Sequence, residues 1–406
     1  MGSRALRSGD VLDRATAAEI RRVCRLAHCC WGPQVGDQVT LAPFPFFITA
    51  RDWTELAALA RDLSTETLAA ERELLRESRL HRDLGLPPGL LALFAQSHAV
   101  RETPSFSRTL RFDFHPTRDG WRVSEVNSDV PGGFSEAESF TALMAEHYSG
   151  SRVPGAPGSR WAECAATSLG SSGLVALLSA PGHMEDFQVT AYLAQRLEQH
   201  GLTTLLLNPT QLGWRDGRAF VARTNAPLTG LVRFYQAEWL ARLPKDTGWQ
   251  RLFFDGETRV SNAAGSALTE SKRFPLSWTH LSTRLPTFSR LLPETRALSE
   301  APWFRDDGWL LKAAYSNAGD SVVARPWVNK ARWARTAAQA LARPRSWVAQ
   351  RRFEIERVDT PEGALAPCVG VYVIDGEVAG AYLRLSKGRL IDYSAMDAAL
   401  LITDEA

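Results

Sequence analysis

The sequence has 406 residues, 45% of them hydrophobic, so the chain can bury a large core and is predicted to form two or three domains. Its 47 lysine and arginine residues nearly balance 45 aspartate and glutamate residues. The net charge of +2 argues against a dedicated polyanion-binding protein.

The cysteine content and the N-terminal stretch indicate the cellular compartment in which the protein is expected. The five cysteines are an odd number without a CxxC spacing, which favours reduced thiols over a disulfide framework. The N-terminal stretch is too polar for a signal peptide, and no apolar run reaches the roughly 18 residues that a membrane span needs. We therefore expect a soluble, cytoplasmic protein.

The first hundred residues differ in pattern from those that follow. Apolar residues recur at helical spacing between about residues 12 and 100, which predicts a helical N-terminal region over 1–104. Strand-like alternation begins near Ser107, and a segment rich in proline, glycine and serine at 149–160 indicates a domain boundary.

The segment over 160–245 contains a buried strand, a loop, an amphipathic helix that ends at Gly201 and another buried strand. This order is typical of a βαβ unit and predicts a parallel, Rossmann-like sheet. The motif GxGxxG is absent, so a dinucleotide is not indicated. Residues 261–300 are expected to be mostly helical, and the chain from Gly308 onward alternates strands with one helix near 329–343, giving a mixed α/β (α+β) fold class.

Side chains alternate along the predicted hairpin RFDFHPTRDGWRVSEVN, which begins at Arg111. If its turn holds three residues, Asp113 lies opposite Glu125 and Arg111 lies opposite Asn127. Two carboxylates this close repel each other unless a positive charge neutralises them. Two interpretations remain open: a structural salt bridge with Arg111, or a hard cation such as Mg²⁺, which prefers carboxylate and amide oxygens.

Other charged residues in the second half of the chain also need partners. Lys312 closes an apolar strand, where its ammonium suits a phosphate or simply reaches solvent. The small residues from Ser316 to Ser321 offer successive backbone N–H groups for phosphate oxygens, with a plain loop as the alternative. Arg384 lies within a mostly apolar strand and pairs there with either a phosphate or an acidic neighbour.

These motifs resemble those of the glutathionylspermidine synthase family, whose synthetase domain is a circularly permuted ATP-grasp ligase. RFD at 111–113 is similar to the family's Arg-x-Asp strand, and EVNSDVP at 125–131 to its Glu-x-Asn motif with a following Asp and Pro. The resemblance continues in order over roughly 105–395, and it includes a Tyr-x-x-Glu-Trp signature at 235–239.

The resemblance implies an ATP-grasp fold whose metal-binding part is 105–150, with a Rossmann-like pre-ATP-grasp domain at 160–245 and a nucleotide-binding part and lid at 260–406. It implies ATP and Mg²⁺ as cofactors. The residues that it assigns fall into three groups: Asp113, Glu125 and Asn127 as metal ligands; Arg111 and Arg384 as catalytic arginines; Lys272, Lys312, Ser316, Asn317, Gly319 and Gln350 as nucleotide-binding residues.

The sequence also departs from the family pattern. Pro131-Gly132-Gly133 replaces the family's Pro-Thr-Ser, and Ala313 follows Lys312 where the family has proline. Asn317-Ala318-Gly319 replaces a loop that carries Arg-Glu-Gly, so a charge pair is lost. Nothing in the helical first hundred residues resembles the amidase domain of bifunctional members, and glutathione and spermidine are not assumed as substrates.

The expected function is an ATP-dependent carboxylate–amine ligase that forms an amide through an acyl phosphate and releases ADP and phosphate. A small-molecule kinase and a non-catalytic ATP-binding scaffold are the alternatives, and a nucleic-acid binder is the weakest. The expected partners are a small-molecule or peptide carboxylate and an amine, without nucleic acid or membrane, and a homodimer is conceivable.

Overall fold

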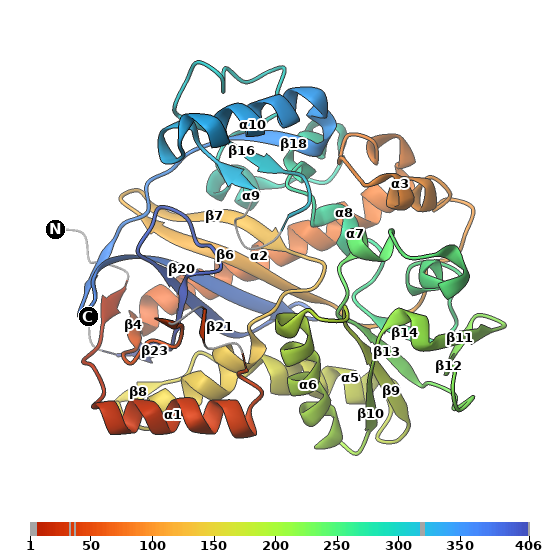
Figure 1. Ribbon diagram of the computed structural model, residues 1–406, viewed down its shortest axis with the longest axis horizontal. Coiled ribbons are helices and arrows are strands. Elements are labelled where there is room, and N and C mark those ends of the chain that lie inside the picture. The colour runs from red at the N-terminus through yellow and green to blue at the C-terminus, as the bar shows by residue number, and fades with distance from the viewer. Residues whose placement is uncertain (1–5, 32–33, 36–37, 317–320, 405–406) are drawn as a thin grey trace.

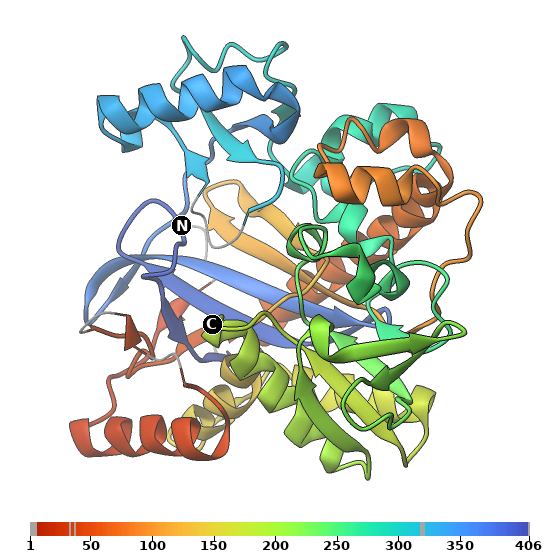
Figure 2. The ribbon, with the colours of Figure 1, turned by 45° about the vertical axis from the view of Figure 1, so that its right-hand side comes forward.

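The computed structural model describes residues 6–31, 34–35, 38–316 and 321–404, and within these ranges it combines α-helices with six β-sheets. Figure 1 labels the elements, and Figure 2 turns the same ribbon by 45°. The predicted mixed α/β class is confirmed.

The central sheet is antiparallel and joins two hairpins that lie far apart in the sequence. Its order is β22-β21-β20-β6-β7, with β19 paired to β20. The strands are β6 (Thr109–Thr117), β7 (Gly120–Asn127), β19 (Val358–Thr360), β20 (Gly363–Ile374), β21 (Glu377–Ser386) and β22 (Met396–Ala398). Because β20 pairs with β6, residues near 111–127 and residues near 368–397 share one sheet.

A second sheet is parallel and has the order β10-β9-β13-β14-β5. Its strands are β5 (Ser105–Ser107), β9 (Leu174–Leu178), β10 (Thr203–Leu207), β13 (Gly230–Arg233) and β14 (Arg259–Ser261), and α6 (Met184–Glu198) connects β9 to β10. The predicted βαβ unit is therefore confirmed. The chain leaves β9 toward β10 on one side and returns to β13 on the other, so the carboxyl end of β9 lies at a topological switch point, where open α/β sheets bind ligands.

The third sheet forms a separate layer above the β6–β7 hairpin (Figure 1). Its antiparallel order is β15-β18-β16-β17, and α10 (Lys330–Ala342) lies over it. The strands are β15 (Thr295–Arg296), β16 (Trp309–Ala313), β17 (Val322–Val323) and β18 (Trp347–Arg351). The predicted helix near 329–343 is α10, which begins after Asn329, whose side chain accepts a hydrogen bond from Arg332 N.

The fourth sheet joins the beginning of the described chain to its end. Its order is β1-β4-β23-β8, and β4 pairs in parallel with β23. The strands are β1 (Arg7–Ser8), β4 (Phe46–Thr49), β8 (Ser151–Arg152) and β23 (Leu400–Thr403). The first hundred residues thus contribute strands as well as helices.

The remaining elements are short connections or helices that cover the sheets. The strand pairs are β2 (Gln34–Val35) with β3 (Gln38–Val39) and β11 (Leu212–Arg215) with β12 (Arg218–Val221). The α-helices are α1 (Arg14–Ala27), α2 (Ala50–Arg76), α3 (Pro88–Phe94), α4 (Thr141–Ala145), α5 (Pro157–Leu169), α7 (Ala237–Leu240), α8 (Ser266–Thr269) and α9 (Pro286–Leu291). The π-helix η2 (Glu136–Phe140) and seven 3₁₀ turns complete the described chain: η1 (Ser78–Leu80), η3 (Pro209–Gln211), η4 (Lys245–Thr247), η5 (Trp249–Leu252), η6 (Phe274–His280), η7 (Arg325–Trp327) and η8 (Pro344–Ser346).

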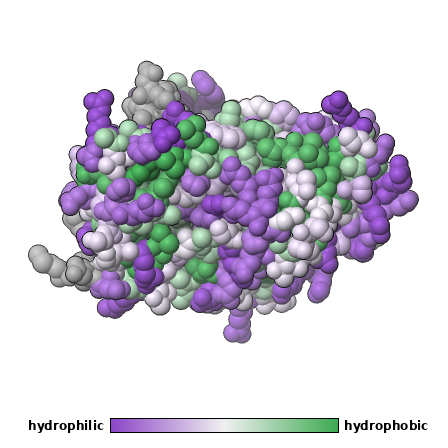
Figure 3. All heavy atoms as spheres, turned by 90° about the horizontal axis from the view of Figure 1, so that it is seen from below, coloured by the Kyte–Doolittle hydropathy of each residue, from purple (hydrophilic) through white to green (hydrophobic). Residues whose placement is uncertain are grey.

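The surface gives no support to a particular partner. The described chain holds no helix with the length and apolar character that crossing a bilayer would require. Seen from below, charged and polar side chains cover much of the surface, and apolar groups form separate areas between them (Figure 3). The homodimer stays a prediction.

The long helix α2 runs behind the central sheet in Figure 1 and packs against β6, β20 and β21. Apolar residues at helical spacing, among them Leu56, Leu63 and Leu74, bury one side of it. Phe112 and Phe114 of β6 belong to the same core. Since strand side chains alternate, Arg111 and Asp113 project from the opposite side of β6.

Glu71 on the buried side of α2 connects this helix to the segment around the hairpin. It forms a buried ion pair with Arg108 and accepts a hydrogen bond from Thr269 Oγ1 at 2.6 Å. Arg108 also donates to the carbonyl oxygens of Ser128 at 2.6 Å and Thr109 at 2.7 Å. One carboxylate therefore ties α2 to both ends of the hairpin.

Replacing Glu71 with alanine should lower the free energy of unfolding by about 3–5 kcal/mol, because Arg108 would stay buried without its counter-ion. The measurement is urea unfolding followed by circular dichroism. Glu55→Ala, at an exposed position of the same helix, is the matched control and should change stability by less than about 0.5 kcal/mol. Equal effects of the two substitutions would show that the buried pair has no special role.

Candidate functional site

The β6–β7 hairpin brings Arg111, Asp113, Glu125 and Asn127 to one face of the central sheet. The predicted register is confirmed: Asp113 lies opposite Glu125 and Arg111 opposite Asn127. The predicted three-residue turn is wrong, since Thr117 pairs directly with Gly120. The register shifts between Asp113 and Phe114, leaving Ser124 as one extra residue on β7, which compensates for the shorter turn.

Arg111 and Asp113 form a buried pair. Arg111 Nε and Nη2 donate to the two carboxylate oxygens of Asp113 at 2.8 and 3.1 Å, and Nη1 donates to Gly132 O at 2.8 Å. Burial alone would raise the pKa of Asp113, but the neighbouring Arg111 guanidinium outweighs it and lowers that pKa. The structure thus contains the salt bridge that was one of the two sequence interpretations.

Gly370 of β20 makes room for this pair. It lies opposite Asp113, and a Cβ at this position would come within 2.8 Å of Arg111 Cδ and 3.1 Å of Asp113 Oδ1. Sequence analysis missed this residue. A glycine inside an otherwise apolar strand is a sign of close approach and could have indicated it.

The bulge at Ser124 also places a backbone acceptor beside Lys312, which lies on β16 of the neighbouring sheet. Lys312 Nζ donates to Ser124 O at 2.9 Å. Within the described ranges, no carboxylate lies at ion-pairing distance from this ammonium, although the lysine is 95% buried. Burial lowers the pKa of Lys312 to about 8. Such a cation needs an anion.

Lys272 is the second buried lysine, and it has acidic partners. Its Nζ lies 3.2 Å from Glu270 Oε1 and 3.5 Å from Glu125 Oε2, and it donates to Ser316 O at 3.1 Å. Burial would lower the pKa of Lys272, but the two carboxylates raise it above its usual value. The ammonium therefore stays charged and joins the hairpin to the segment that follows β16.

Arg384 approaches the same place from β21. Its Nη2 donates to Asp392 O at 2.7 Å, and its Nε lies 3.9 Å from Asp397 Oδ1. Tyr382 donates to the same Asp397 oxygen at 2.6 Å. Burial raises the pKa of Asp397 to about 7, with a further contribution from Glu136. The predicted acidic partner of Arg384 is thus present but distant.

A cavity of about 130 Å³, called here the lysine cavity, collects these residues. Its polar end is lined by Arg111, Asp113, Ser124, Glu125, Asn127, Lys272, Lys312, Ser316 and Arg384. Its other end is apolar, with Leu310, Val322, Trp327, Phe353, Ile355, Leu390 and Ile391, and Gln350 of β18 also lines it. The cavity thus combines charged groups, which suit phosphates, with apolar and amide groups, which suit a base.

A larger cavity of about 610 Å³, called here the acidic cavity, adjoins the lysine cavity. The two share Arg111, Glu125, Asn127, Ser316 and Arg384. Five further carboxyl groups line the acidic cavity: Glu136, Glu185, Asp186, Glu238 and Asp397. Burial, with Asp129 as the next contribution, raises the pKa of Glu238 to about 7. Two ligands can therefore meet at the shared residues.

The residues of the polar end suit a magnesium ion in their chemistry. No group of three or more His, Cys, Asp and Glu residues converges in the described part of the chain. The predicted ligands are instead two carboxylates and an amide, which match the oxygen preference of Mg²⁺ when phosphates supply further ligands. Both Asp113 oxygens already accept from Arg111, but a carboxylate has about four acceptor sites, so capacity remains.

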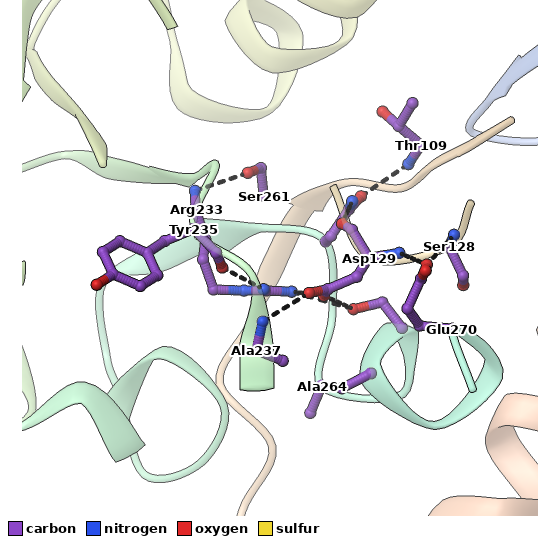
Figure 4. Close-up of polar contacts among 12 residues, drawn as sticks. Thr109, Ser128, Asp129, Arg233, Tyr235, Ala237, Ser261, Ala264 and Glu270 are labelled. Atoms are coloured by element: carbon purple, nitrogen blue, oxygen red, sulfur yellow. Dashed lines mark hydrogen bonds and ion pairs between the residues drawn. The ribbon is translucent and has the colours of Figure 1, made fainter. Parts of the chain in front are cut away.

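The loop after β7 is fixed by a buried network that sequence analysis missed (Figure 4). Asp129 pairs with Arg233 of β13 and accepts hydrogen bonds from Ala237 N at 2.8 Å and Ser266 Oγ at 3.0 Å. Glu270 accepts from the backbone N–H groups of Ser128 at 2.7 Å and Asp129 at 3.0 Å. A charged residue inside the apolar strand GLVR was the available signal, because a buried charge requires a partner.

The structure thus brings nine of the predicted site residues together: Arg111, Asp113, Glu125, Asn127, Lys272, Lys312, Ser316, Gln350 and Arg384. Asn317 and Gly319 lie outside the described residues. The roles given to these residues stay predictions.

Comparison with known proteins identifies the family. The sequence profile described as glutathionylspermidine synthase preATP-grasp matches residues 44–402, and the chain belongs to this family of ligase-like enzymes with an ATP-grasp-related fold. A search of curated proteins finds none that matches the chain. A solved structure from Methylobacillus flagellatus KT, described as a "Putative gamma-glutamylcysteine synthetase", is 13% identical, with 79% of this chain and 84% of that chain covered. Its TM-score against this chain is 0.42.

Asp397 makes stability depend on pH. Its pKa is about 7 in the folded chain, against 3.8 for an ordinary aspartate, so between these values the folded state holds a proton that the unfolded state has lost. Stability therefore falls as pH rises through this window. In Asp397→Asn this loss is absent. The free energy of unfolding of the variant should therefore rise by at least about 1 kcal/mol relative to that of the parent between pH 4.5 and 7.5.

Thermal unfolding at a series of pH values tests this expectation. Asp404→Asn, at an exposed position near the end of the described chain, is the control and should run parallel to the parent. A constant difference between Asp397→Asn and the parent across the series would contradict the raised pKa.

Proposed function

We propose that the chain is an ATP-dependent carboxylate–amine ligase that forms an amide through an acyl phosphate and releases ADP and phosphate. The observation that carries the proposal is Lys312. Its ammonium is buried and pairs with no carboxylate of the described residues. It lines the lysine cavity, which shares five lining residues with a second cavity rich in carboxyl groups. A phosphate group at this point would supply the missing negative charge.

The lysine cavity is the proposed nucleotide site. The apolar end would accommodate the base, with Gln350 able to present an amide to its edge. Lys312, Lys272 and Arg384 would neutralise the phosphates at the polar end, where the charge of a transferring phosphoryl group develops. These are fixed, buried positions, so little reorganisation accompanies the reaction.

Asp113, Glu125 and Asn127 are the proposed ligands of Mg²⁺. When bound, this ion would neutralise charge on the phosphate oxygens. Arg111 holds Asp113 in place through two hydrogen bonds and faces both cavities. Its guanidinium is therefore in position to stabilise an acyl phosphate formed where the cavities meet.

The acidic cavity is the proposed amine site. An amine is positively charged at neutral pH, and the five further carboxyl groups of this cavity favour a cation. An ammonium must lose a proton before it can attack, and Glu238, with its pKa of about 7, can accept one near neutral pH. The geometry favours a ligase over a kinase, because a second, oppositely charged cavity adjoins the first.

Asp113→Asn and Glu125→Gln should each lower ADP formation by at least about 100-fold, since each removes a charge from the metal and phosphate end. The assay uses ATP, Mg²⁺ and a panel of carboxylic acids, with hydroxylamine as the amine that traps an activated acyl group. Asp119→Asn, at the exposed turn of the same hairpin, is the matched control and should retain full turnover. Normal turnover in both site variants with intact folding would overturn the metal assignment.

The reaction should also depend on the charge of Lys312. Its pKa of about 8 means that the ammonium is charged below that pH and neutral above it. Because kcat/KM reports the free enzyme, kcat/KM for ATP should fall by about tenfold per pH unit above pH 8. Lys312→Arg keeps its charge, so its lower activity should not decline further up to pH 9.5. A parent profile that stays flat over this range would contradict the assigned role.

A further inference from the structure

A groove of about 320 Å³ lies beside the acidic cavity at the carboxyl ends of β9 and β10. The β9–α6 loop, the start of α6 and the end of β10 form its walls, and Leu206, Leu207 and Pro181 are among its lining residues. His183 lines both the groove and the acidic cavity, so the two spaces adjoin at this residue. This edge of a parallel sheet is where open α/β folds bind ligands.

The first turns of α6 present different kinds of side chain to the acidic cavity and to the groove. Glu185 and Asp186 line the acidic cavity, whereas Met184 and Phe187, three residues apart and therefore on one side of the helix, line the groove. Met184 is 57% exposed and Phe187 is 40% exposed, which is unusual for large apolar side chains. The helix thus presents carboxylates to one ligand space and apolar surface to its neighbour.

Trp31 extends the apolar wall from the N-terminal region. Its ring lies 5.6 Å from that of Phe187, and its backbone N–H donates to Gln188 Oε1 at 2.8 Å. Gln188 lines the acidic cavity, so this hydrogen bond ties the position of Trp31 to the same wall. Trp31 is itself 38% exposed. Three exposed apolar side chains therefore gather at one end of one helix.

No aspartate, glutamate, lysine or arginine is among the described residues that line the groove. Glu185 and Asp186, which follow His183 in the chain, line the acidic cavity. A ligand that spans both spaces would place a positive group among the carboxylates and an uncharged, apolar group against Met184 and Phe187. A second positive group in the groove would lose its water without gaining a counter-ion.

We propose that the groove binds the apolar tail of the amine substrate, whose ammonium lies in the acidic cavity. The substrate class is therefore an alkylamine or arylalkylamine with one positive end, rather than a diamine or polyamine. This inference rests on the proposed function in one respect: it takes the acidic cavity as the amine site.

Equilibrium binding of simple amines to the full chain tests the inference without any turnover. The probes are n-alkylamines from propylamine to octylamine and α,ω-diamines of equal length, measured by calorimetry at pH 7.5. Affinity for the monoamines should rise about threefold to fourfold per methylene once the chain reaches the groove. Each diamine should bind more weakly than the monoamine of the same length.

Substitutions in the groove test whether its side chains cause the dependence of amine affinity on chain length. Met184→Ser and Phe187→Ser, both at exposed positions that tolerate polar groups, should flatten the dependence on chain length while leaving propylamine binding unchanged. Phe304→Ser, at another exposed phenylalanine in the segment between β15 and β16, is the control and should keep the full dependence. Glu185→Gln should weaken all monoamines by a similar factor without changing the slope.

Several outcomes would overturn the inference. These are diamines that bind more tightly than monoamines, a slope that survives both groove substitutions, absence of amine binding at millimolar concentration, or a monomer–dimer equilibrium that Phe187→Ser abolishes. ADP formation by the parent chain with a hydroxylamine-trapped acyl product, together with any of these, would leave the proposed function standing. Chain-length dependence without ADP formation would leave the groove assigned and the ligase reaction refuted.

Discussion

The buried ion pair between Asp129 and Arg233 is the constraint on which the rest of the site depends. It fixes the loop after β7 to β13 of the parallel sheet, and Ala237 N and Ser266 Oγ complete the carboxylate's partners. Burying two charges lowers stability unless they are well paired and hydrogen-bonded. Here the contacts of the Asp129 carboxylate all hold the same loop. Asn127 and Glu125 lie on β7 directly before that loop, so the loop holds the end of the strand that carries them.

The loop held by the Asp129–Arg233 pair also affects the positions of the buried lysines. Glu270 holds the same loop by two backbone N–H groups and also lies beside Lys272, so loop geometry and the position of a buried cation are coupled. Lys312 has only a backbone carbonyl as its described hydrogen-bond partner. Lys272 is therefore neutralised by carboxylates of the protein, whereas Lys312 can pair with an anion. This arrangement is expected in a site that binds and releases an anionic ligand.

Local patterns in the sequence were enough for the elements and the hairpin register. Alternation along β6 and β7 predicted that Asp113 faces Glu125, and helical spacing predicted α6 and α10. The turn length was missed because the turn is one residue shorter than predicted while the bulge at Ser124 adds one residue to β7. The two changes together leave Asp113 opposite Glu125, so the alternation of side chains does not reveal either one. The resemblance to a family, rather than any local pattern, brought Lys272, Lys312 and Gln350 into one group.

What could not be predicted depends on contacts between distant segments. The network of Glu71, Arg108 and Thr269 joins positions almost 200 residues apart, and no spacing within one segment shows it. The same holds for Gly370, whose lack of a side chain matters only because β20 lies against β6. The groove beside α6 requires both the helix and the end of β10, with Trp31 added from the N-terminal region.

The pairing of β4 with β23 bears on how the chain folds during its synthesis. Asp397 N donates to Thr40 O at 2.7 Å, and Ala42 N donates to Asp397 O at 2.8 Å, so one carboxyl group of the acidic cavity is held by backbone from the beginning of the chain. A ribosome releases these partners more than 350 residues apart, and the edge of β4 that faces β23 stays unpaired until β23 emerges. The acidic wall therefore cannot assemble before β23 has been synthesised, and one edge of β4 stays open to misassociation while the intervening residues are made.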